Sequence, residues 1–316
     1  MTATAQAALV GLDWGTSSLR AYLFDARGAV VERRPRPWGI QALPAGGYPA
    51  AFSETVGDWL ARWPGLPVLA SGMVGSRQGW REAAYVACPL DVAALAGGIL
   101  QAETECGRVG IVPGVVQSGA TPDMMRGEET QVVGALAGDA TLATASVCVL
   151  PGSHSKWVEV HGGRITGLTS FLTGELFAAL RDHSLLGRPA RDTGETATAA
   201  ASAAAFARGV RAVRDAGPRG VSSLLFTARS LWLTGALTAG ETLDYLSGLI
   251  VGDEVRAMVA GRGGDARPPL VLIGAPELCD RYRTALADFG FADVRLAGDT
   301  AAAGLWRIAS AAGLTT

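Results

Sequence analysis

Short apolar runs that end in polar or small residues recur along the chain, and this pattern predicts strands. The runs Leu9–Leu12, Leu19–Asp25 and Ala29–Arg34 are separated by tight turns, which predicts an antiparallel three-stranded meander. Apolar residues at helical spacing then predict a helix over Tyr48–Trp63. The first half continues with two strands and a helix, predicted over Pro67–Ser71, Val109–Pro113 and Glu128–Leu136.

The same order of elements begins again near residue 141. A second meander is predicted over Ser146–Leu150, Trp157–Val160 and Ile165–Ser170. Helices and strands then alternate over Gly174–Leu185, Pro269–Ile273, Pro276–Phe289, Asp293–Leu296 and Thr300–Ala311. The repeat lies in the order of elements rather than in residue identity, and it predicts a duplicated α/β protein. We therefore expect an N-terminal lobe over residues 1–140 and a C-terminal lobe over residues 141–316.

An Ala- and Gly-rich stretch at about residues 188–264 interrupts the second half. Its apolar residues follow helical spacing near Ala203–Asp215 and Leu243–Val259. A helical insert is favoured over a disordered linker, because Phe206 and Val210 continue the helical spacing after the run of alanines.

Composition and charge exclude several classes of protein. Hydrophobic residues make up 49% of the 316 residues, which allows a large core, and the formal net charge of −2 provides no general attraction to nucleic acid or membranes. The four cysteines form no C-x-x-C pair, and with three histidines a zinc cluster is not expected. No apolar run of about 18 residues occurs, and the first residues do not resemble a signal peptide, so we expect a cytoplasmic protein.

The stretch "DWGTSSLR" places an acid at the end of the first predicted strand. Gly15 allows a close turn, and Thr16 and Ser17 add hydroxyl and backbone N–H donors that suit phosphate oxygens. The carboxylate of Asp13 suits hydrated Mg²⁺. An ordinary hairpin with an Asx-type turn is an equal alternative for this stretch alone.

A second hairpin, "LPGSHSKW", stands at the equivalent point of the second half. Gly152 and Ser153 repeat the small and hydroxyl residues, and Lys156 could neutralise the transferred phosphoryl group. Two such hairpins facing one cleft would hold the two ends of a triphosphate. The alternative for Lys156 is a solvated lysine at a strand end, and for His154 an ordinary turn histidine is the favoured interpretation.

Further candidates lie at the ends of other elements. In "MMRGEETQ", Arg126 could bind an anion, and Glu128 or Glu129 could act as a base, although acids are also common in a first helical turn. The loop "SGMVGSRQGW" has the small, polar and aromatic residues that suit a polyhydroxylated ligand, or it is a plain surface loop. Its candidates are Gly72, Ser76, Arg77 and Trp80. Late in the chain, "GAPE" contributes Gly274, Ala275 and Glu277 as candidates beside a purine, and "AGDT" follows another strand.

Other common catalytic motifs are absent from the sequence. It contains no P-loop, no G-x-G-x-x-G opening a helix, no G-x-S-x-G elbow and no H-E-x-x-H. A P-loop enzyme, a Rossmann NAD enzyme, an α/β-hydrolase and a zincin are therefore not expected.

Several blocks in a fixed order resemble the 2-dehydro-3-deoxygalactonokinase family of the actin-like ATPase and sugar kinase superfamily. They run from Asp13 to Gly304 and read "DWGTSSLRAY", "GMVGSRQGW", "MRGEETQ", "PGSHSKWV", "TGELF" and "AGDTAAAG". The resemblance implies a duplicated actin-like (ribonuclease H-like) ATPase fold with a mixed five-stranded sheet in each lobe. It also implies ATP-dependent phosphorylation of the 6-hydroxyl of 2-dehydro-3-deoxy-D-galactonate, with Mg²⁺, in galactonate breakdown in the cytoplasm.

The hypothesis of an ATP-dependent sugar-acid kinase gives roles to the candidate residues. Asp13 would orient Mg²⁺ through water, the two hairpins would hold the phosphates, and the turn at Gly274 would border the adenosine. Many members of the superfamily use an aspartate base, whereas "RGEETQ" resembles the "GxEEA" element of exopolyphosphatases, whose first acid corresponds to Glu128. The choice between Glu128 and Glu129 stays open. Arg126 is the first candidate for the substrate carboxylate, and Arg77 is the second.

Two other functions remain as alternatives. One is a phosphohydrolase of the same fold that acts on polyphosphate or nucleotides, and the other is a non-catalytic actin-like ATP-binding protein. The substrate-type loop at residues 72–80 favours the kinase over both. No nucleic-acid or membrane partner is expected, and a homodimer is one arrangement that the sequence allows.

Overall fold

The computed structural model describes residues 6–260 and 268–315, so the outer ends of the predicted lobes and the end of the predicted insert, residues 261–264, lie outside the described residues. The chain divides into two compact units. Unit 1 takes in the described residues up to Cys148, the segment Val158–Thr169 and the residues from Asp299 on, and unit 2 takes in Val149–Trp157 and the described part of Ser170–Gly298. The units do not follow the lobes predicted as 1–140 and 141–316, because unit 1 also takes in residues 141–148, Val158–Thr169 and the last helix of the chain.

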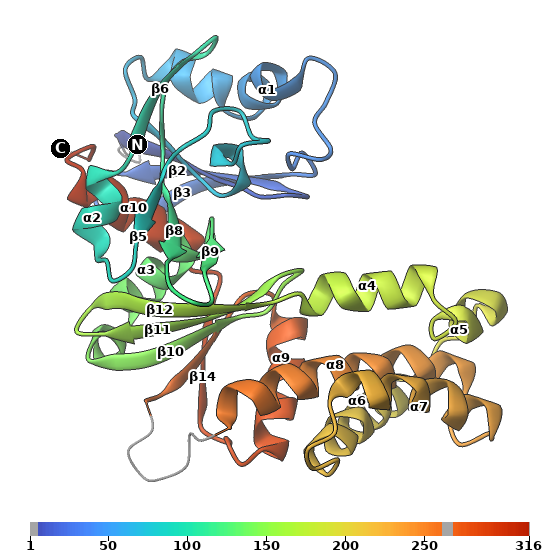
Figure 1. The fold of residues 1–316 in the computed structure, drawn as a ribbon. Helices are drawn as coiled ribbons and strands as arrows, with labels where there is room; N and C mark the ends of the chain where they lie inside the picture. Colours follow the sequence, from blue (N-terminus) through green and yellow to red (C-terminus); the bar gives the residue numbers. More distant parts are fainter. Residues whose placement is uncertain (1–5, 261–267, 316) are drawn as a thin grey trace, which may run out of the picture. The chain divides into compact units, whose positions relative to one another are not determined.

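The first sheet of the protein has six strands in the order β3-β2-β1-β4-β7-β6 (Figure 1). The strands are β1 (Ala7–Trp14), β2 (Leu19–Asp25), β3 (Val30–Arg36), β4 (Val68–Ser71), β6 (Leu100–Thr104) and β7 (Gly107–Ile111). Strands β1, β2 and β3 form the predicted antiparallel meander, and β4 lies parallel to both β1 and β7. The prediction of five strands is wrong for this sheet, because β6 turns back and pairs antiparallel with β7.

Both faces of β1 are buried, which explains its nearly continuous apolar sequence. Helix α1 (Gly47–Arg62) contributes Phe52 and Val56 to a core that includes Leu12. Helix α10 (Ala301–Ala311) packs on the strand at Gly11, where an added Cβ would come within 3.2 Å of a Leu305 methyl group. The chain end is thus part of the core of unit 1.

A small sheet of three strands leads to helix α3 (Glu128–Gly138), in the order β5-β8-β9. These strands are β5 (Tyr85–Ala87), β8 (Gly114–Gln117) and β9 (Asp123–Met125), and helix α2 (Val92–Gly97) and β6 lie between β5 and β7 in the chain. None of these four strands or helix α2 is predicted from the sequence, since the strands have only three to five residues each and the helix has six.

The second sheet repeats the order of the first five strands, as β12-β11-β10-β13-β14. Its strands are β10 (Ala145–Leu150), β11 (Ser155–His161), β12 (Arg164–Phe171), β13 (Leu270–Ile273) and β14 (Val294–Gly298). The parallel pair β13 and β14 follows the meander as β4 and β7 follow theirs. This shared order establishes the structural duplication that the sequence predicts.

The helices of unit 2 include the predicted insert (Figure 1). They are α4 (Thr173–His183), α5 (Arg188–Thr193), α6 (Ala199–Arg214), α7 (Val221–Leu233), α8 (Ala239–Val259) and α9 (Pro276–Asp288). Helices α6 and α8 approach closely where glycines meet: a Cβ on Gly209 would lie 2.3 Å from the Tyr245 carbonyl. Helices α6 and α8 correspond to the predicted helices, whereas α5 and α7 are not predicted.

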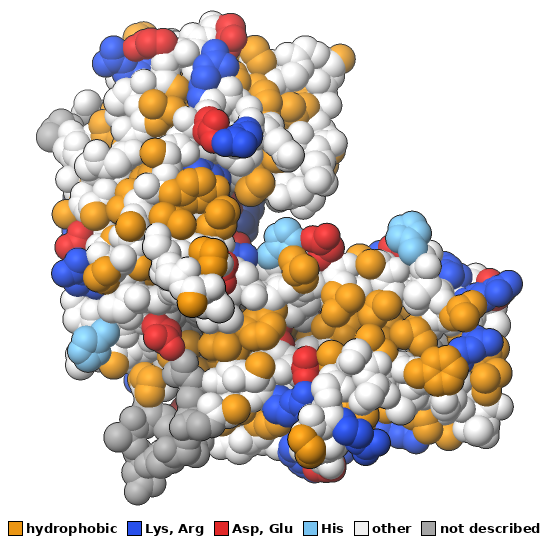
Figure 2. All heavy atoms as spheres, viewed as in Figure 1, with side chains coloured by type: hydrophobic (Ala, Val, Ile, Leu, Met, Phe, Trp, Pro, Cys, Tyr) orange, Lys and Arg blue, Asp and Glu red, His pale blue; other side chains and the backbone are white. Residues whose placement is uncertain are grey.

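The surface agrees with a nearly neutral chain. In Figure 2, lysines and arginines lie among aspartates and glutamates, and no large area of one sign covers the face shown. Among the described residues, no helix combines the length and the apolar character that crossing a membrane requires.

Candidate active site

Asp13 stands one residue before the end of β1, between two neighbouring strands. It pairs in register with Arg20 on β2 and with Ser71 on β4. The Arg20 guanidinium forms an ion pair with the Asp13 carboxylate, and its other nitrogen lies 3.1 Å from the carboxylate of Asp299. Burial raises the pKa of Asp13, and the opposite charge of Arg20 works against that rise.

The turn of the first predicted phosphate hairpin is exposed, as a phosphate-binding turn must be. The Gly15 N–H donates to the Ser18 carbonyl at 2.9 Å, which closes the turn and leaves Thr16 and Ser17 exposed. The segment that contains Gln41 packs against this turn, because the Gln41 N–H donates to the Thr16 carbonyl at 3.1 Å. Gly39 is required there, because a Cβ would lie 2.2 Å from that carbonyl oxygen.

The start of α3 lies against the ends of β1 and β4. A Cβ on Gly127 would come within 3.2 Å of the Gly72 Cα, and a Cβ on Gly72 would come within 2.7 Å of the Trp14 carbonyl. Both glycines have positive φ values, +107° and +99°, that other residues rarely adopt. The close approach brings Asp13, Gly72 and the two glutamates of α3 into one region of unit 1.

The two adjacent glutamates have different surroundings. Glu129 is fully buried, and both its carboxylate oxygens accept from the Gly127 N–H, at 2.9 and 2.8 Å. Burial, reinforced by the charge of Glu128, raises the pKa of Glu129 to about 8. Glu128 is only half-buried, and its Oε2 accepts from the Arg126 N–H at 3.1 Å.

Arg126 is buried with unused hydrogen-bonding capacity. Its Nη2 donates to the Ala83 carbonyl at 2.7 Å, and its guanidinium lies 4.3 Å from the ring centroid of Tyr85. Its Nε and Nη1 have no hydrogen-bond partner, and neither has the buried hydroxyl of Ser76. Buried polar groups are normally paired, so these orphaned groups indicate a place for a polar ligand.

Trp80 and Arg77, from the loop predicted to bind a polyhydroxylated ligand, differ in how exposed their side chains are. Trp80 is 7% exposed, and its ring stacks on Tyr48 and meets Trp14 edge-on in the core of unit 1. It therefore offers no open aromatic face. Arg77 has a side chain that is 88% exposed, with Glu82 at 3.5 Å.

The second predicted phosphate hairpin lies in unit 2, packed against the start of α4. A Cβ on Gly174 would be 2.6 Å from the Gly152 carbonyl, and the Glu175 N–H donates to the Ser153 carbonyl at 3.0 Å. Lys156 is 5% exposed, and its ammonium donates to the His154 carbonyl at 3.1 Å. The solvated-lysine alternative is therefore wrong. His154 is exposed in the turn and pairs with Glu175.

A cavity of about 180 Å³ opens beside this hairpin. Its lining comes from the hairpin and from α4, α8 and α9, and consists of Gly152, Thr173, Gly174, Phe177, Asp244, Ser247, Ile250, Val251, Leu278, Arg281 and Tyr282. Gly274, with φ +142°, lies near the hairpin, since its Cβ would be 3.8 Å from the Pro151 carbonyl. Ala275 and Glu277 are exposed where α9 begins.

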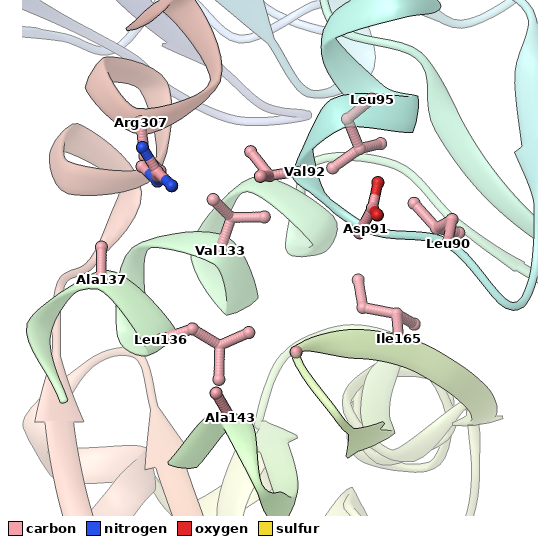
Figure 3. A pocket seen from close by; sticks show the side chains of 11 residues that line it. Leu90, Asp91, Val92, Leu95, Val133, Leu136, Ala137, Ala143, Ile165 and Arg307 are labelled. Carbon is pink, nitrogen blue, oxygen red and sulfur yellow. The ribbon is translucent and has the colours of Figure 1, made fainter. Parts of the chain in front are cut away.

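A cavity of about 170 Å³ in unit 1 has a different character. Figure 3 shows aliphatic side chains around it, among them Val133, Leu136 and Ile165, together with Asp91 and Arg307. None of the predicted site residues lines this cavity.

Two polar residues of the predicted ligand loops, Ser71 and Asp299, lie near these groups, and a third polar residue, Glu254, is missed as a candidate. Ser71 follows an apolar run, and its hydroxyl lies 2.6 Å from that of Thr130 beside Glu129. Asp299 pairs with Arg20 although 279 positions separate them. Glu254 is 1% exposed in α8, and its spacing of four from Ile250 on an apolar stripe is the signal that could have revealed it.

Comparisons with known proteins indicate one family of kinases. The family model of 2-keto-3-deoxy-galactonokinase matches residues 13–308. "Probable 2-dehydro-3-deoxygalactonokinase DgoK1" of Rhizobium meliloti (strain 1021) is 35% identical over 88% of this chain and 89% of its own length. The "2-dehydro-3-deoxygalactonokinase" of Escherichia coli (strain K12) is 34% identical over 96% and 97%.

A solved structure has the same fold. The crystal structure of a "putative 2-dehydro-3-deoxygalactonokinase protein" from Sinorhizobium meliloti superposes with a TM-score of 0.83 at 32% identity, covering 96% of this chain and 98% of that one. The prediction of a duplicated actin-like α/β fold is confirmed. From these matches over nearly its whole length, the chain belongs to the 2-keto-3-deoxy-galactonokinase family.

Proposed function

We propose that this protein is an ATP-dependent kinase that phosphorylates the 6-hydroxyl of 2-dehydro-3-deoxy-D-galactonate. Family membership and the names of the two relatives support the sugar acid and the reaction. The observation that carries the proposal is the convergence of Asp13, Gly72 and the glutamates of α3 within unit 1, in a chain that matches this family over residues 13–308.

Glu128 is the proposed general base. A base must reach the substrate hydroxyl, and the half-buried carboxylate of Glu128 meets this need better than the fully buried one of Glu129. Glu128 takes the proton as the hydroxyl oxygen attacks the γ-phosphorus, and the bond to the leaving ADP oxygen breaks. Glu129 holds the Gly127 N–H and so fixes the backbone turn on which Glu128 stands.

Arg126 is proposed to bind the carboxylate of the sugar acid. Its Nε and Nη1 are unpaired donors of a buried, always charged guanidinium, so either can donate to an oxygen of a carboxylate. The unpaired hydroxyl of Ser76 and the backbone at Gly72 supply further contacts for a polar ligand. Arg77 stays the second candidate for the carboxylate.

ATP is proposed to use groups from both units. Gly15, Thr16 and Ser17 contribute N–H and hydroxyl donors from unit 1. From unit 2 come Gly152, Ser153 and the ammonium of Lys156, and the cavity beside Gly152 would take the adenosine, bordered by Gly274, Ala275 and Glu277. The prediction that the two hairpins face one cleft concerns the placement of the units and stays a prediction.

The residues around Asp13 fit a magnesium ion that is held mainly by phosphate and water. Mg²⁺ commonly uses only one or two protein carboxylates in kinase sites. Among the described residues, no group of three or more His, Cys, Asp or Glu side chains that could hold a metal is present, and Asp13 supplies one carboxylate at the strand end, with Arg20 paired to it. Bound there, Mg²⁺ would neutralise charge on the phosphates.

A coupled assay of ADP release tests the function directly. Purified protein with Mg²⁺ and ATP is offered a panel of 2-keto-3-deoxy sugar acids, including the galactonate- and gluconate-derived epimers. We expect turnover with the galactonate-derived acid and little ADP release without an acceptor. Phosphate release without any sugar acid would support the phosphohydrolase, and ATP binding with filament formation but no turnover would support the non-catalytic alternative. The homodimer and the cytoplasmic location stay predictions.

A further inference from the structure

Glu254 is a buried carboxylate that no step of the proposed reaction uses. It lies on α8 at 1% exposure and accepts hydrogen bonds from three side chains of unit 2. Trp157 Nε1 donates to Oε1 at 2.7 Å, the Tyr282 hydroxyl donates to Oε2 at 2.7 Å, and the Thr173 hydroxyl donates to Oε2 as well.

The three donors come from three elements around the second hairpin. Trp157 follows Lys156 directly in β11, and Thr173 opens α4, whose next residue packs on the Gly152 carbonyl. Tyr282 lies on α9, and both it and Thr173 line the cavity beside Gly152. The carboxylate therefore joins the hairpin strand, α4, α8 and α9 at one point.

A contribution to folding stability does not by itself explain why the core of unit 2 contains the Glu254 carboxylate. Desolvation of a carboxylate is costly, and burial raises the pKa of Glu254 against the effect of its hydrogen bonds. Apolar side chains of similar volume often stabilise a core as well as or better than a buried polar network. A fully paired network instead fixes geometry, because each donor must keep its direction.

We propose that Glu254 is a positioning residue for the nucleotide: it holds the hairpin strand, the start of α4 and α9 in the one arrangement in which Gly152, Ser153 and Lys156 meet the triphosphate. The inference rests on the proposed function, since it assumes that this hairpin binds ATP. It predicts that weakening the network impairs nucleotide binding and spares binding of the sugar acid.

The test compares two buried tyrosine hydroxyls of unit 2. Tyr282→Phe removes one donor to Glu254 and keeps the ring. Tyr245→Phe is the matched control: Tyr245 is equally buried, at 3% against 2%, and its hydroxyl pairs at 2.9 Å with Thr227 in the helical insert. Both variants should lose thermal stability, and Tyr282→Phe should lose more, because its hydrogen bond goes to a carboxylate whereas that of Tyr245 goes to a hydroxyl.

The two variants should differ in nucleotide affinity. We expect Tyr282→Phe to raise the KM for ATP and the Kd for MgADP measured by calorimetry by about fivefold to tenfold, because part of the free energy of one hydrogen bond to a charged group is lost from the arrangement that binds the nucleotide. Tyr245→Phe should leave both constants unchanged, and the KM for the sugar acid should be unchanged in both variants. Glu254→Gln should exceed the effect of Tyr282→Phe, because an amide cannot accept from all three donors.

Two results separate failure of this inference from failure of the proposed function. If the wild-type protein uses ATP and Tyr282→Phe changes only its melting temperature, the Glu254 network is purely structural and the inference is wrong. If the wild-type protein neither binds MgADP nor turns over ATP, the proposed function itself is wrong. Tyr282→Phe keeps the test valid if Glu254→Gln does not fold.

Discussion

At the residue scale, the two neighbouring glutamates at the start of α3 have different proposed roles, Glu128 as the general base and Glu129 as the residue that fixes the turn before it. Replacing Glu128 by Gln removes the proposed proton acceptor but keeps the shape of the side chain. We expect kcat to fall about 10²- to 10⁴-fold, with the Kd for MgADP unchanged. Steady-state kinetics and calorimetry measure the two quantities. Near-normal turnover of Glu128→Gln would show that another group accepts the proton.

The raised pKa of Glu129 should make the unfolding free energy of the protein depend on pH. Its pKa of about 8 lies above the ordinary value of 4.5, so between these pH values the unfolded chain has lost a proton that the folded chain keeps. The folded state therefore loses stability relative to the unfolded state as pH rises through this range. Glu129→Gln has no such proton.

Urea unfolding at pH 5 and pH 8 measures this effect. The difference in unfolding free energy between Glu129→Gln and the wild type should shift in favour of the variant at pH 8, by on the order of 1–3 kcal/mol. A difference that is the same at both pH values would contradict the raised pKa.

The sequence singles out candidate residues more readily than it predicts how exposed their side chains are. Asp13, Gly15 and Lys156 are recognisable because small and charged residues directly follow or begin apolar runs. Trp80 is expected in an open loop, yet it lies in the core, since an aromatic side chain suits both places equally. The helical spacing of Glu254 could have revealed that it is buried, but its donors lie 28 to 97 positions away, so no local pattern predicts the network.

At the element scale, α3 and α10 depend on two glycines where they cross. A Cβ on Gly304 would lie 1.8 Å from the Thr130 carbonyl oxygen, and one on Gly134 would lie 2.0 Å from that of Thr300. We expect Gly304→Ala to lower the unfolding free energy by about 1–3 kcal/mol despite the better helix propensity of alanine, because backbone must move. Urea unfolding provides the measurement.

Gly138 is the matched control for this crossing. It ends α3, and a Cβ added there would meet nothing within 4 Å. Gly138→Ala should leave stability unchanged or raise it by up to about 1 kcal/mol. Equal effects of the two substitutions would mean that the helices do not cross as closely as the structure has them.

Elements with long, regular patterns are predicted well, and short ones are not. The periodic helices α1, α6 and α8 and the meander strands lie close to their predicted ranges. Strands β5, β8 and β9 have three or four residues each, too few for an alternating pattern to stand out. Strand β6 is set by its pairing with β7, which is a tertiary contact rather than a local preference.

At the scale of the whole molecule, sequence order and structural unit do not coincide. The final helix completes the core of unit 1, although most of the chain between α3 and α10 belongs to unit 2. The sequence could not predict this, because the repeat of elements places α10 with the second half. Two buried leucines, one in each unit, allow the independence of the units to be tested.

Leu305 in α10 and Leu249 in α8 are both fully buried, and each packs within its own unit. Replacing either by Ala should cost about 2–5 kcal/mol locally, through lost burial and the cavity left behind. If each unit opens as its own cooperative body, amide hydrogen exchange in Leu305→Ala should accelerate in β1 and α3 while α6 keeps its protection. Leu249→Ala should do the reverse. Mass spectrometry of the exchanged peptides distinguishes this outcome from a uniform loss of protection in both variants, which would mean that the two units unfold as one.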